Sequence, residues 1–288
     1  MKTLRAMRAR IRAAKNIQQI TRAMKLVSAA RLRRAQDRVL AARPYAQRMH
    51  EVLQELGRAG ELPEHPLLQQ REARTYGFVL ATSDRGLCGA YNMNLIRTLQ
   101  NTMRNFNLTP EQVRLFCVGR RGYQFFSKRG YPIALYRPMP TSGAGLEDAR
   151  AVANAVEQAF VSGEVDRVYL IYAQFINPVT QRPTVLPLLP IEPPAGADGE
   201  PKYDFIFEPS AEELLQRLLP RYLLTEVLQA LLEASASEHG ARMTAMSMAS
   251  DNAGKMIQEL TLIMNRIRQA TITKEIAEVV GGAEALKG

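Results

Sequence analysis

The stretch Met7–Gln36, MRARIRAAKNIQQITRAMKLVSAARLRRAQ, decides how this chain folds. Apolar or small residues recur there at steps of three or four, which is the spacing of one helix face. With the residues just before it, the face comprises Leu4, Met7, Ile11, Ala14, Ile17, Ile20, Met24 and Val27. No glycine occurs before Gly57, and Pro44 is the only early proline. We therefore expect a single helix of roughly 55 residues, with Pro44 as the place for a kink. Helices average about 11–12 residues, so one this long needs a partner along its length.

The C-terminal part of the chain carries a matching helical pattern. Its later apolar face comprises Met243, Met246, Ala249, Ala253, Met256, Leu260, Ile263, Ile267 and Ala270. Gly240 and Gly254 lie inside this pattern, where each costs about 1 kcal/mol relative to alanine unless close packing offsets the cost. Small residues at a seam let two helices approach closely. We expect the two chain ends to form an antiparallel coiled coil.

Between these helices, apolar runs alternate with helical segments. The runs TYGFVLAT (75–82), VRLFCVG (113–119) and DRVYLIYA (166–173) read as buried strands, and the Pro/Gly-rich segment 187–203 reads as a loop. Alternating strands and helices imply a Rossmann-like α/β layer with mostly parallel strands. The predicted fold class is therefore α/β plus long helices. Its expected parts are a long N-terminal helix at 1–57, a linker at 58–73, an α/β domain at 74–205 and a long C-terminal helix at 206–288.

The positive charge is concentrated at one end. Residues 1–50 hold fourteen of the 38 Lys and Arg residues and one acid, Asp37, while the whole chain has a net charge of +10. A cationic helix of this kind fits a nucleic acid or an acidic protein surface. The segment holds one aromatic residue, Tyr45, and matches no helix-turn-helix or zipper-type basic region. A transit peptide is a further reading of an Arg-rich start, although the helical spacing continues without a cleavage-like break.

The loop TSDRGLCGAYN, Thr82–Asn92, is the best candidate for chemistry because glycines, an acid and a thiol follow a strand. It matches neither the dinucleotide fingerprint nor the phosphate-binding loop. Cys88 could act as a nucleophile only beside a base, and the three histidines, His50, His65 and His239, lie outside the α/β segment. Cys88 and Cys117 form no CxxC, and the histidines lack metal-ligand spacing. We therefore predict no catalytic residue, cofactor or metal in this chain.

Four stretches together resemble one family, the gamma subunit of F-type ATP synthases. They are Met7–Gln36, Thr82–Asn92, Ser237–Ala253 (SEHGARMTAMSMASDNA) and Ile272–Ala285 (ITKEIAEVVGGAEA), and their order and spacing fit that family along essentially the whole chain. The last motif is the most specific. The resemblance implies a rotor shaft inside a ring of three α and three β subunits, with the α/β domain as a foot near the epsilon subunit and the ring of c subunits. It also implies that the chain couples ion-driven rotation to ATP synthesis without a catalytic site of its own.

The same resemblance implies which residues meet partner subunits. The expected β-subunit contacts are Met24, Lys25, Arg85, Cys88, Arg242, Arg268, Gln269, Thr273 and Glu275, and the expected epsilon or c-ring contacts are Phe205 and Phe207. The family-like start favours a bacterial protein, peripheral on the cytoplasmic face of the cell membrane. The alternatives that stay open are a nucleic-acid-binding coiled-coil protein and an enzyme that uses the α/β loop.

Overall fold

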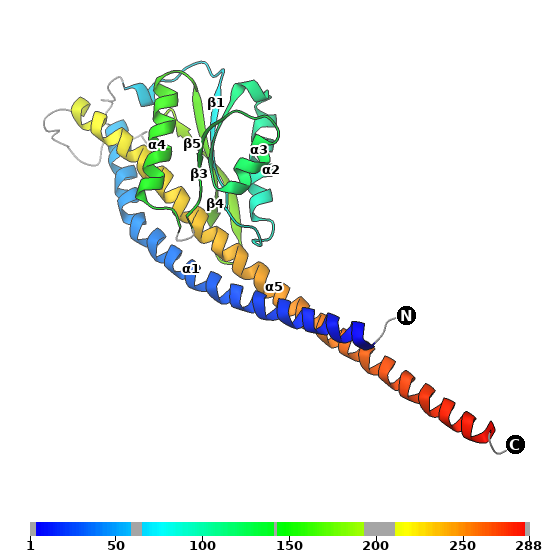
Figure 1. Ribbon diagram of the computed structural model, residues 1–288. Helices are drawn as coiled ribbons and strands as arrows, with labels where there is room; N and C mark the ends of the chain where they lie inside the picture. Colours follow the sequence, from blue (N-terminus) through cyan, green and yellow to red (C-terminus); the bar gives the residue numbers. More distant parts are fainter. Residues whose placement is uncertain (1–3, 59–64, 141–142, 193–210, 286–288) are drawn as a thin grey trace. The chain divides into compact units, whose positions relative to one another are not determined.

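The computed structural model describes residues 4–58, 65–140, 143–192 and 211–285. Two helices are far longer than the rest: α1 spans Leu4–Arg58 and α5 spans Ala211–Ala285 (Figure 1). Pro44 lies within α1 and Pro220 within α5, and both helices continue through them. No described helix is both long and apolar enough to cross a membrane. The chain divides into two compact units, Ser28–Arg242, and Met1–Val27 together with Met243–Gly288.

The unit Ser28–Arg242 contains a five-stranded sheet in the order β3-β2-β1-β4-β5. The strands are β1 (Tyr76–Ala81), β2 (Val113–Val118), β3 (Ile133–Arg137), β4 (Arg167–Phe175) and β5 (Gln181–Leu189). β1 pairs in parallel with β2 and β4, and β2 in parallel with β3, whereas β5 is antiparallel to β4. The mostly parallel α/β layer expected from the sequence is confirmed.

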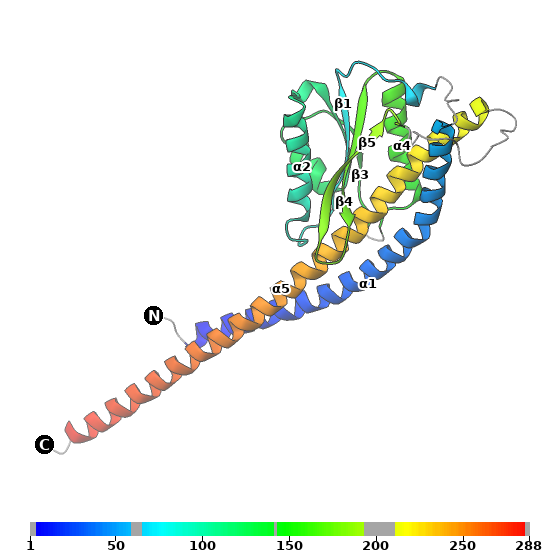
Figure 2. The ribbon, with the colours of Figure 1, turned by 180° about the vertical axis from the view of Figure 1, so that it is seen from behind.

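Helices cover both faces of this sheet (Figure 2). α2 (Tyr91–Asn105) and α3 (Arg120–Ser127) pack on one face, and α4 (Leu146–Val161) and α5 pack on the other. Successive residues of β1 serve the two sides in turn: Phe78 belongs to the core beneath α2 and α3, and Val79 to the core beneath α4 and α5. Because both faces are covered, the three central strands β1, β2 and β4 are largely apolar runs. Two short 3₁₀ helices, η1 (Pro66–Leu68) and η2 (Pro110–Gln112), precede β1 and β2.

Two strands, β3 and β5, were not predicted from the sequence. β3 has five residues, and only part of each side chain is shielded, so it shows no clear apolar run. β5 contains Pro183 and Pro187, and its last three residues, Pro187–Leu189, lie in the segment expected to be a loop. That expectation was wrong for these residues, because β5 is an edge strand and such strands tolerate proline. Residues 193–203 of the expected loop lie outside the described residues.

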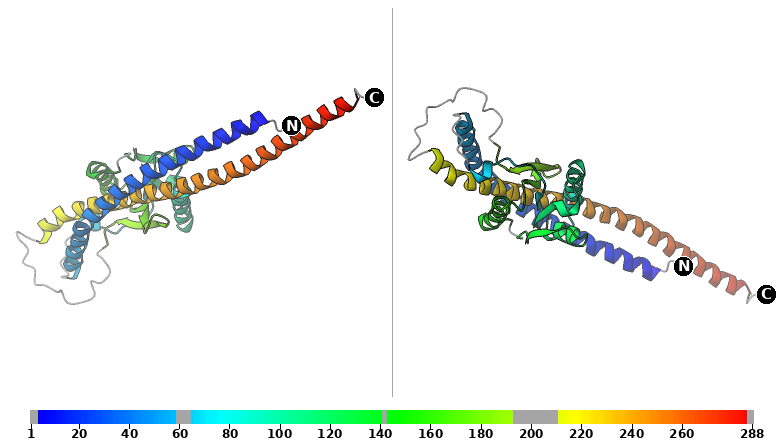
Figure 3. Two further views of the ribbon diagram at one scale, coloured as in Figure 1. Left: turned by 90° about the horizontal axis from the view of Figure 1, so that it is seen from below. Right: turned by 90° about the horizontal axis from the view of Figure 1, so that it is seen from above.

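The second unit is built from the N-terminal part of α1 and the C-terminal part of α5, which run side by side (Figure 3). A Cβ atom added at Gly254 would lie 3.0 Å from Nε2 of Gln18, so the close approach expected at this glycine is present. Among the described residues of this unit, the buried side chains are Met7, Ala14, Thr21, Met246 and Ala253. The seam therefore uses small residues and methionine, as the sequence indicated.

The expected apolar face of α1 was partly wrong. Ile17, Ile20 and Val27 are 53%, 60% and 51% exposed, while Thr21 and Ser28 are buried. Buried residues recur every seven positions at Met7, Ala14, Thr21, Ser28 and Ala35, a repeat of 3.5 residues per turn that is typical of a left-handed coiled coil. The hydroxyl of Thr21 can be buried in the seam because it donates a hydrogen bond to the Ile17 carbonyl at 2.9 Å. On α5, Met256 and Ala270 are likewise exposed rather than on the packed face.

Candidate functional site: the loop after β1 and its contacts with α5

The loop after β1 is fixed at its start by buried hydrogen bonds. Thr82, fully buried, donates from its backbone to the Val118 carbonyl at 2.8 Å, and its hydroxyl accepts the Gly122 N–H at 2.9 Å. Oδ1 of Asp84 accepts the N–H groups of Arg120 at 2.8 Å and Met139 at 3.1 Å. These bonds tie the loop to the segments that follow β2 and β3. Asp84 is thus a local structural acceptor here.

Cys88 lies in a small polar cluster beneath the loop. The Asn92 amide lies 2.8 Å from Oγ of Ser83 and 3.2 Å from Sγ of Cys88. The Cys88 side chain is only 2% exposed, and burial raises the pKa of its thiol. Leu87, with φ of 63°, and Gly89, with φ of 60°, turn the chain sharply, which leaves Leu87 62% exposed at the tip. The loop presents Arg85 and Leu87 outward and keeps its thiol inside.

α5 holds the other side of the loop through Arg242. Its guanidinium donates to the carbonyls of Arg85, at 3.2 Å from Nη2, and Gly86, at 3.3 Å from Nε. The same Nη2 lies 2.7 Å from Oε1 of Glu238, with both side chains about nine-tenths buried. One turn away from Glu238, the hydroxyl of Tyr91 donates to the Ala234 carbonyl at 3.0 Å. Arg242 and Tyr91 therefore join α5 to the loop from both ends.

The electrostatics of this cluster follow from its burial. Burial raises the pKa of Glu238, and the neighbouring Arg242 opposes that rise. Burial, together with the charges of Arg242 and Arg31, lowers the pKa of His239 to about 4. His239 is therefore neutral at pH 7, and its Nδ1 lies 3.4 Å from Nη1 of Arg242, where it can accept a hydrogen bond. The cluster contains one ion pair and one neutral imidazole.

This arrangement fills the place where α/β sheets usually bind ligands. Such sites lie beyond the carboxyl ends of the strands, between loops that leave in different directions. Here α5 crosses the loops after β1 and β4: Arg242 contacts Arg85 and Gly86, and a Cβ atom at Gly240 would lie 3.3 Å from Cα of Pro178. Within the described part of the chain, no group of three or more His, Cys, Asp or Glu side chains could hold a metal ion. The loop is built for a structural contact with α5.

The residues expected to meet β subunits lie in different surroundings. In the unit Ser28–Arg242, Arg85 is exposed, whereas Cys88 and Arg242 are buried, and the structure brings all three together. In the second unit, Lys25 is exposed and Met24 is partly buried. Four others in that unit are exposed on α5: Arg268, Gln269, Thr273 and Glu275. Phe205 and Phe207 lie outside the described residues.

Three members of the loop cluster were missed from the sequence: Tyr91, Glu238 and His239. The spacing of Glu238 and Arg242, four residues apart on a predicted helix, is the signal that could have revealed their ion pair. Nothing local marks Tyr91, because its partner is a backbone carbonyl 143 residues away along the chain.

The whole chain has close sequence relatives. A family model described as ATP synthase matches residues 3–286. The ATP synthase gamma chain of Desulforamulus reducens is 45% identical over 287 residues, and that of Desulfitobacterium hafniense is 48% identical over 295 residues, with 100% of both chains covered in each case. These matches extend over both long helices and the α/β domain.

Solved structures share the fold. A chain from the central stalk and c-ring structure of the Tetrahymena thermophila mitochondrial ATP synthase is 26% identical, with a TM-score of 0.61, covering 80% of this chain and 99% of that one. A chain of the Euglena gracilis mitochondrial ATP synthase is 19% identical, with a TM-score of 0.71, and covers 98% of this chain and 94% of that one. With full-length relatives at 45–48% identity, the chain belongs to the ATP synthase gamma chain family.

Proposed function

We propose that this chain is the central rotor shaft of an F-type ATP synthase, which couples ion-driven rotation of a c-subunit ring to ATP synthesis and hydrolysis at catalytic β subunits. The observation that carries the proposal is the uncovered end of α5. Every side chain from Arg268 to Ala283 is exposed, and Ile272, Ile276, Val279 and Val280 form an apolar stripe that is 48–72% exposed. An apolar stripe on a helix that nothing covers marks a surface for a partner. A ring of α and β subunits around the helix would cover it on all sides.

The proposed mechanism is a population shift imposed by rotation. A shaft whose faces differ makes different contacts with each of three β subunits, and each contact favours one nucleotide-binding state of that subunit. On α1, the exposed apolar side chains Ile17, Ile20 and Val27 lie among basic ones and would add such a face. Met24 and Lys25 lie in the same stretch and are proposed to meet an acidic lever loop of β. The remaining proposed β contacts on α5 are Arg268, Gln269, Thr273 and Glu275.

The buried cluster suggests a different role for Arg242 and Cys88. Both were expected to contact β directly, but their side chains are 7% and 2% exposed. We propose that Arg242 holds the loop and that Arg85 and Leu87 make its outward contact. Cys88 supports the loop from beneath.

We further propose that the chain has no catalytic site of its own and that it acts as a peripheral subunit on the cytoplasmic face of a bacterial membrane. The proposed division is a stalk helix at 1–57, a linker at 58–73, a foot at 74–205 and a second stalk helix at 206–288. The foot would face the epsilon subunit and the c ring, with Phe205 and Phe207 as contacts. Support for the first point is the thiol of Cys88, which is 2% exposed and whose pKa burial raises, so that it stays protonated.

Co-expression with the cognate α and β subunits tests the proposal. The chain should co-purify with them at one copy per three α and three β, and adding it to α and β should stimulate ATP hydrolysis. Failure to assemble would contradict the proposal. Tight, salt-dependent binding to nucleic acid in place of assembly would favour the alternative.

A further inference from the structure

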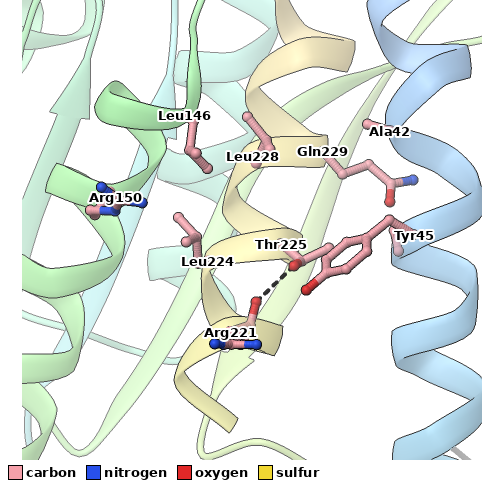
Figure 4. A pocket seen from close by; sticks show the side chains of 10 residues that line it. Ala42, Tyr45, Leu146, Arg150, Arg221, Leu224, Thr225, Leu228 and Gln229 are labelled. Atoms are coloured by element: carbon pink, nitrogen blue, oxygen red, sulfur yellow. Dashed lines mark hydrogen bonds between the residues drawn. The ribbon is translucent and has the colours of Figure 1, made fainter. Parts of the chain in front are cut away.

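A pocket of about 520 Å³ lies between α1, α4 and α5 within the unit Ser28–Arg242 (Figure 4). Its volume falls in the range of about 300–1,000 Å³ that small-molecule sites occupy. The apolar part of its wall comprises Ala42, Ala46, Leu146, Leu224 and Leu228. Leu146 is 49% exposed, so the pocket opens to solvent beside it.

The polar part of the wall is cationic. Arg150 on α4 and Arg221 on α5 both line the pocket, and no Asp or Glu does. Within the described ranges neither guanidinium forms an ion pair with a protein carboxylate. The ring of Tyr45 reaches from α1 toward Thr225 and Arg221, as Figure 4 shows. Two arginines that face a pocket without an acid leave a positive charge for a ligand to neutralise.

The hydrogen bonds in the pocket wall indicate how a bound ligand would be oriented. The Thr225 hydroxyl donates its proton to the Arg221 carbonyl at 2.7 Å, so it offers only acceptor lone pairs to the pocket. An anion would therefore avoid Thr225 and bind the guanidiniums, whose planar donors match carboxylate geometry. The leucines of α4 and α5 leave an apolar surface for the rest of the ligand.

We propose that this pocket binds a small amphipathic anion, a free carboxylate with an aliphatic body, whose head pairs with Arg150 and Arg221 and whose body packs on Leu146, Leu224 and Leu228. A ligand seated there would contact three helices at once and tie α1 to α4 and α5 within this unit. This site does not depend on the proposed rotor function, because its argument uses only the pocket wall. A failed binding experiment would leave that function untouched.

Decanoate below its micellar range is the probe, titrated into the purified full-length chain by calorimetry. We expect saturable binding at one site per chain, with much weaker binding of the neutral decanol and none of the cationic decyltrimethylammonium. The double variant Arg150→Gln/Arg221→Gln should lose about tenfold or more in affinity, because it removes both charged donors that would pair with the carboxylate. The control Arg97→Gln/Arg104→Gln removes the same two charges from exposed positions of α2 and should change nothing.

A second variant tests the pocket itself. Ala42→Phe places a ring into the pocket from a partly exposed position of α1 and should abolish binding while circular dichroism and thermal unfolding stay normal. No saturable decanoate binding, or binding that both variants leave intact, would overturn the proposal. If Ala42→Phe blocks assembly with the epsilon subunit and the parent chain does not bind decanoate, a side chain of that subunit fills the pocket in the complex. The proposal is then wrong.

Discussion

Nη2 of Arg242 lies 2.7 Å from Oε1 of Glu238, and this nearly buried pair holds the loop that follows β1. The guanidinium satisfies a carboxylate on its own helix and two carbonyls of the loop at once. A buried charge that loses its partner is strongly destabilising, whereas an exposed pair contributes little. The pair therefore determines whether the loop keeps its shape.

Removal of this guanidinium should be costly. We predict that Arg242→Met lowers the free energy of unfolding by about 3 kcal/mol, because it leaves Glu238 buried and two loop carbonyls without a donor. Protonation of Glu238, whose pKa burial already raises, limits the loss. Urea unfolding followed by circular dichroism measures it. The matched control is Arg217→Met, since Arg217 pairs with Glu213 on the same helix with side chains 75% and 45% exposed. That control should cost less than about 1 kcal/mol, and equal losses in the two variants would refute the role given to Arg242.

His239 should make the chain sensitive to acid. Its pKa is about 4 in the folded chain against 6.5 when unfolded. Between these values the unfolded chain binds a proton that the folded chain excludes, so stability is full above pH 6.5 and falls as the pH drops toward 4, by about 3 kcal/mol in total. Glu226, Glu233 and Glu238 act in the opposite direction, since burial raises their pKa values.

The variant His239→Gln separates the histidine from these carboxyls, because glutamine can still accept from Arg242. Unfolding by urea at pH 4.5 and pH 7 should show a smaller acid loss in the variant than in the parent. An identical loss in both proteins would mean that His239 does not titrate in this range.

Gly119 sits where a side chain has no room. Its φ is +93°, and an added Cβ atom would overlap the Thr82 carbonyl oxygen. We predict that Gly119→Ala costs about 3 kcal/mol or more, from backbone strain and the clash together. Gly130→Ala is the control, since Gly130 has φ of +75° with nothing within 4 Å of an added Cβ atom. It should cost about 1 kcal/mol, for the strain alone. Similar unfolding midpoints for the two variants would show that the clash relaxes freely.

A substitution at Met24 tests the proposed contact with the β subunit. Met24→Lys adds a cation beside Lys25 on a partly buried helix position, where an acidic lever loop would bind it more tightly. We expect assembly with α and β to be retained and the coupling between ATP hydrolysis and ion pumping to change, as measured in membrane vesicles. The control Met93→Lys makes the same change on α2, where Met93 is 42% exposed. Unchanged coupling in Met24→Lys would argue against the contact.

Sequence reasoning found the long helices and the parallel strands because each has a strong period or a long apolar run. It chose Ile17 and Ile20 for the coiled-coil seam because they are large and apolar, but the seam follows a seven-residue repeat through Thr21 and Ser28 instead. Polar residues at a seam give no hydrophobic pattern in the sequence. The exposed isoleucines do give one, but they lie on a surface other than the seam.

The loop cluster shows a different limit. The strand and the glycine turn could be predicted from the sequence. Tyr91 and Arg242, however, bind backbone carbonyls that are distant in sequence. No residue pattern identifies a carbonyl as a partner. Only the path of α5 across the ends of β1 and β4 brings these groups together and closes the place where a ligand would otherwise bind.

Direct observation of rotation tests the central claim. Cys88 and Cys117 are both buried, so a Lys128→Cys change at the exposed position just after α3 would give one reactive thiol for a visible probe. The complex of this chain with three α and three β subunits would be fixed to a surface through β and supplied with ATP. The account predicts that the probe turns in one direction, in steps, and stops when ATP is removed. A complex that hydrolyses ATP while the labelled chain stays fixed relative to β would contradict it.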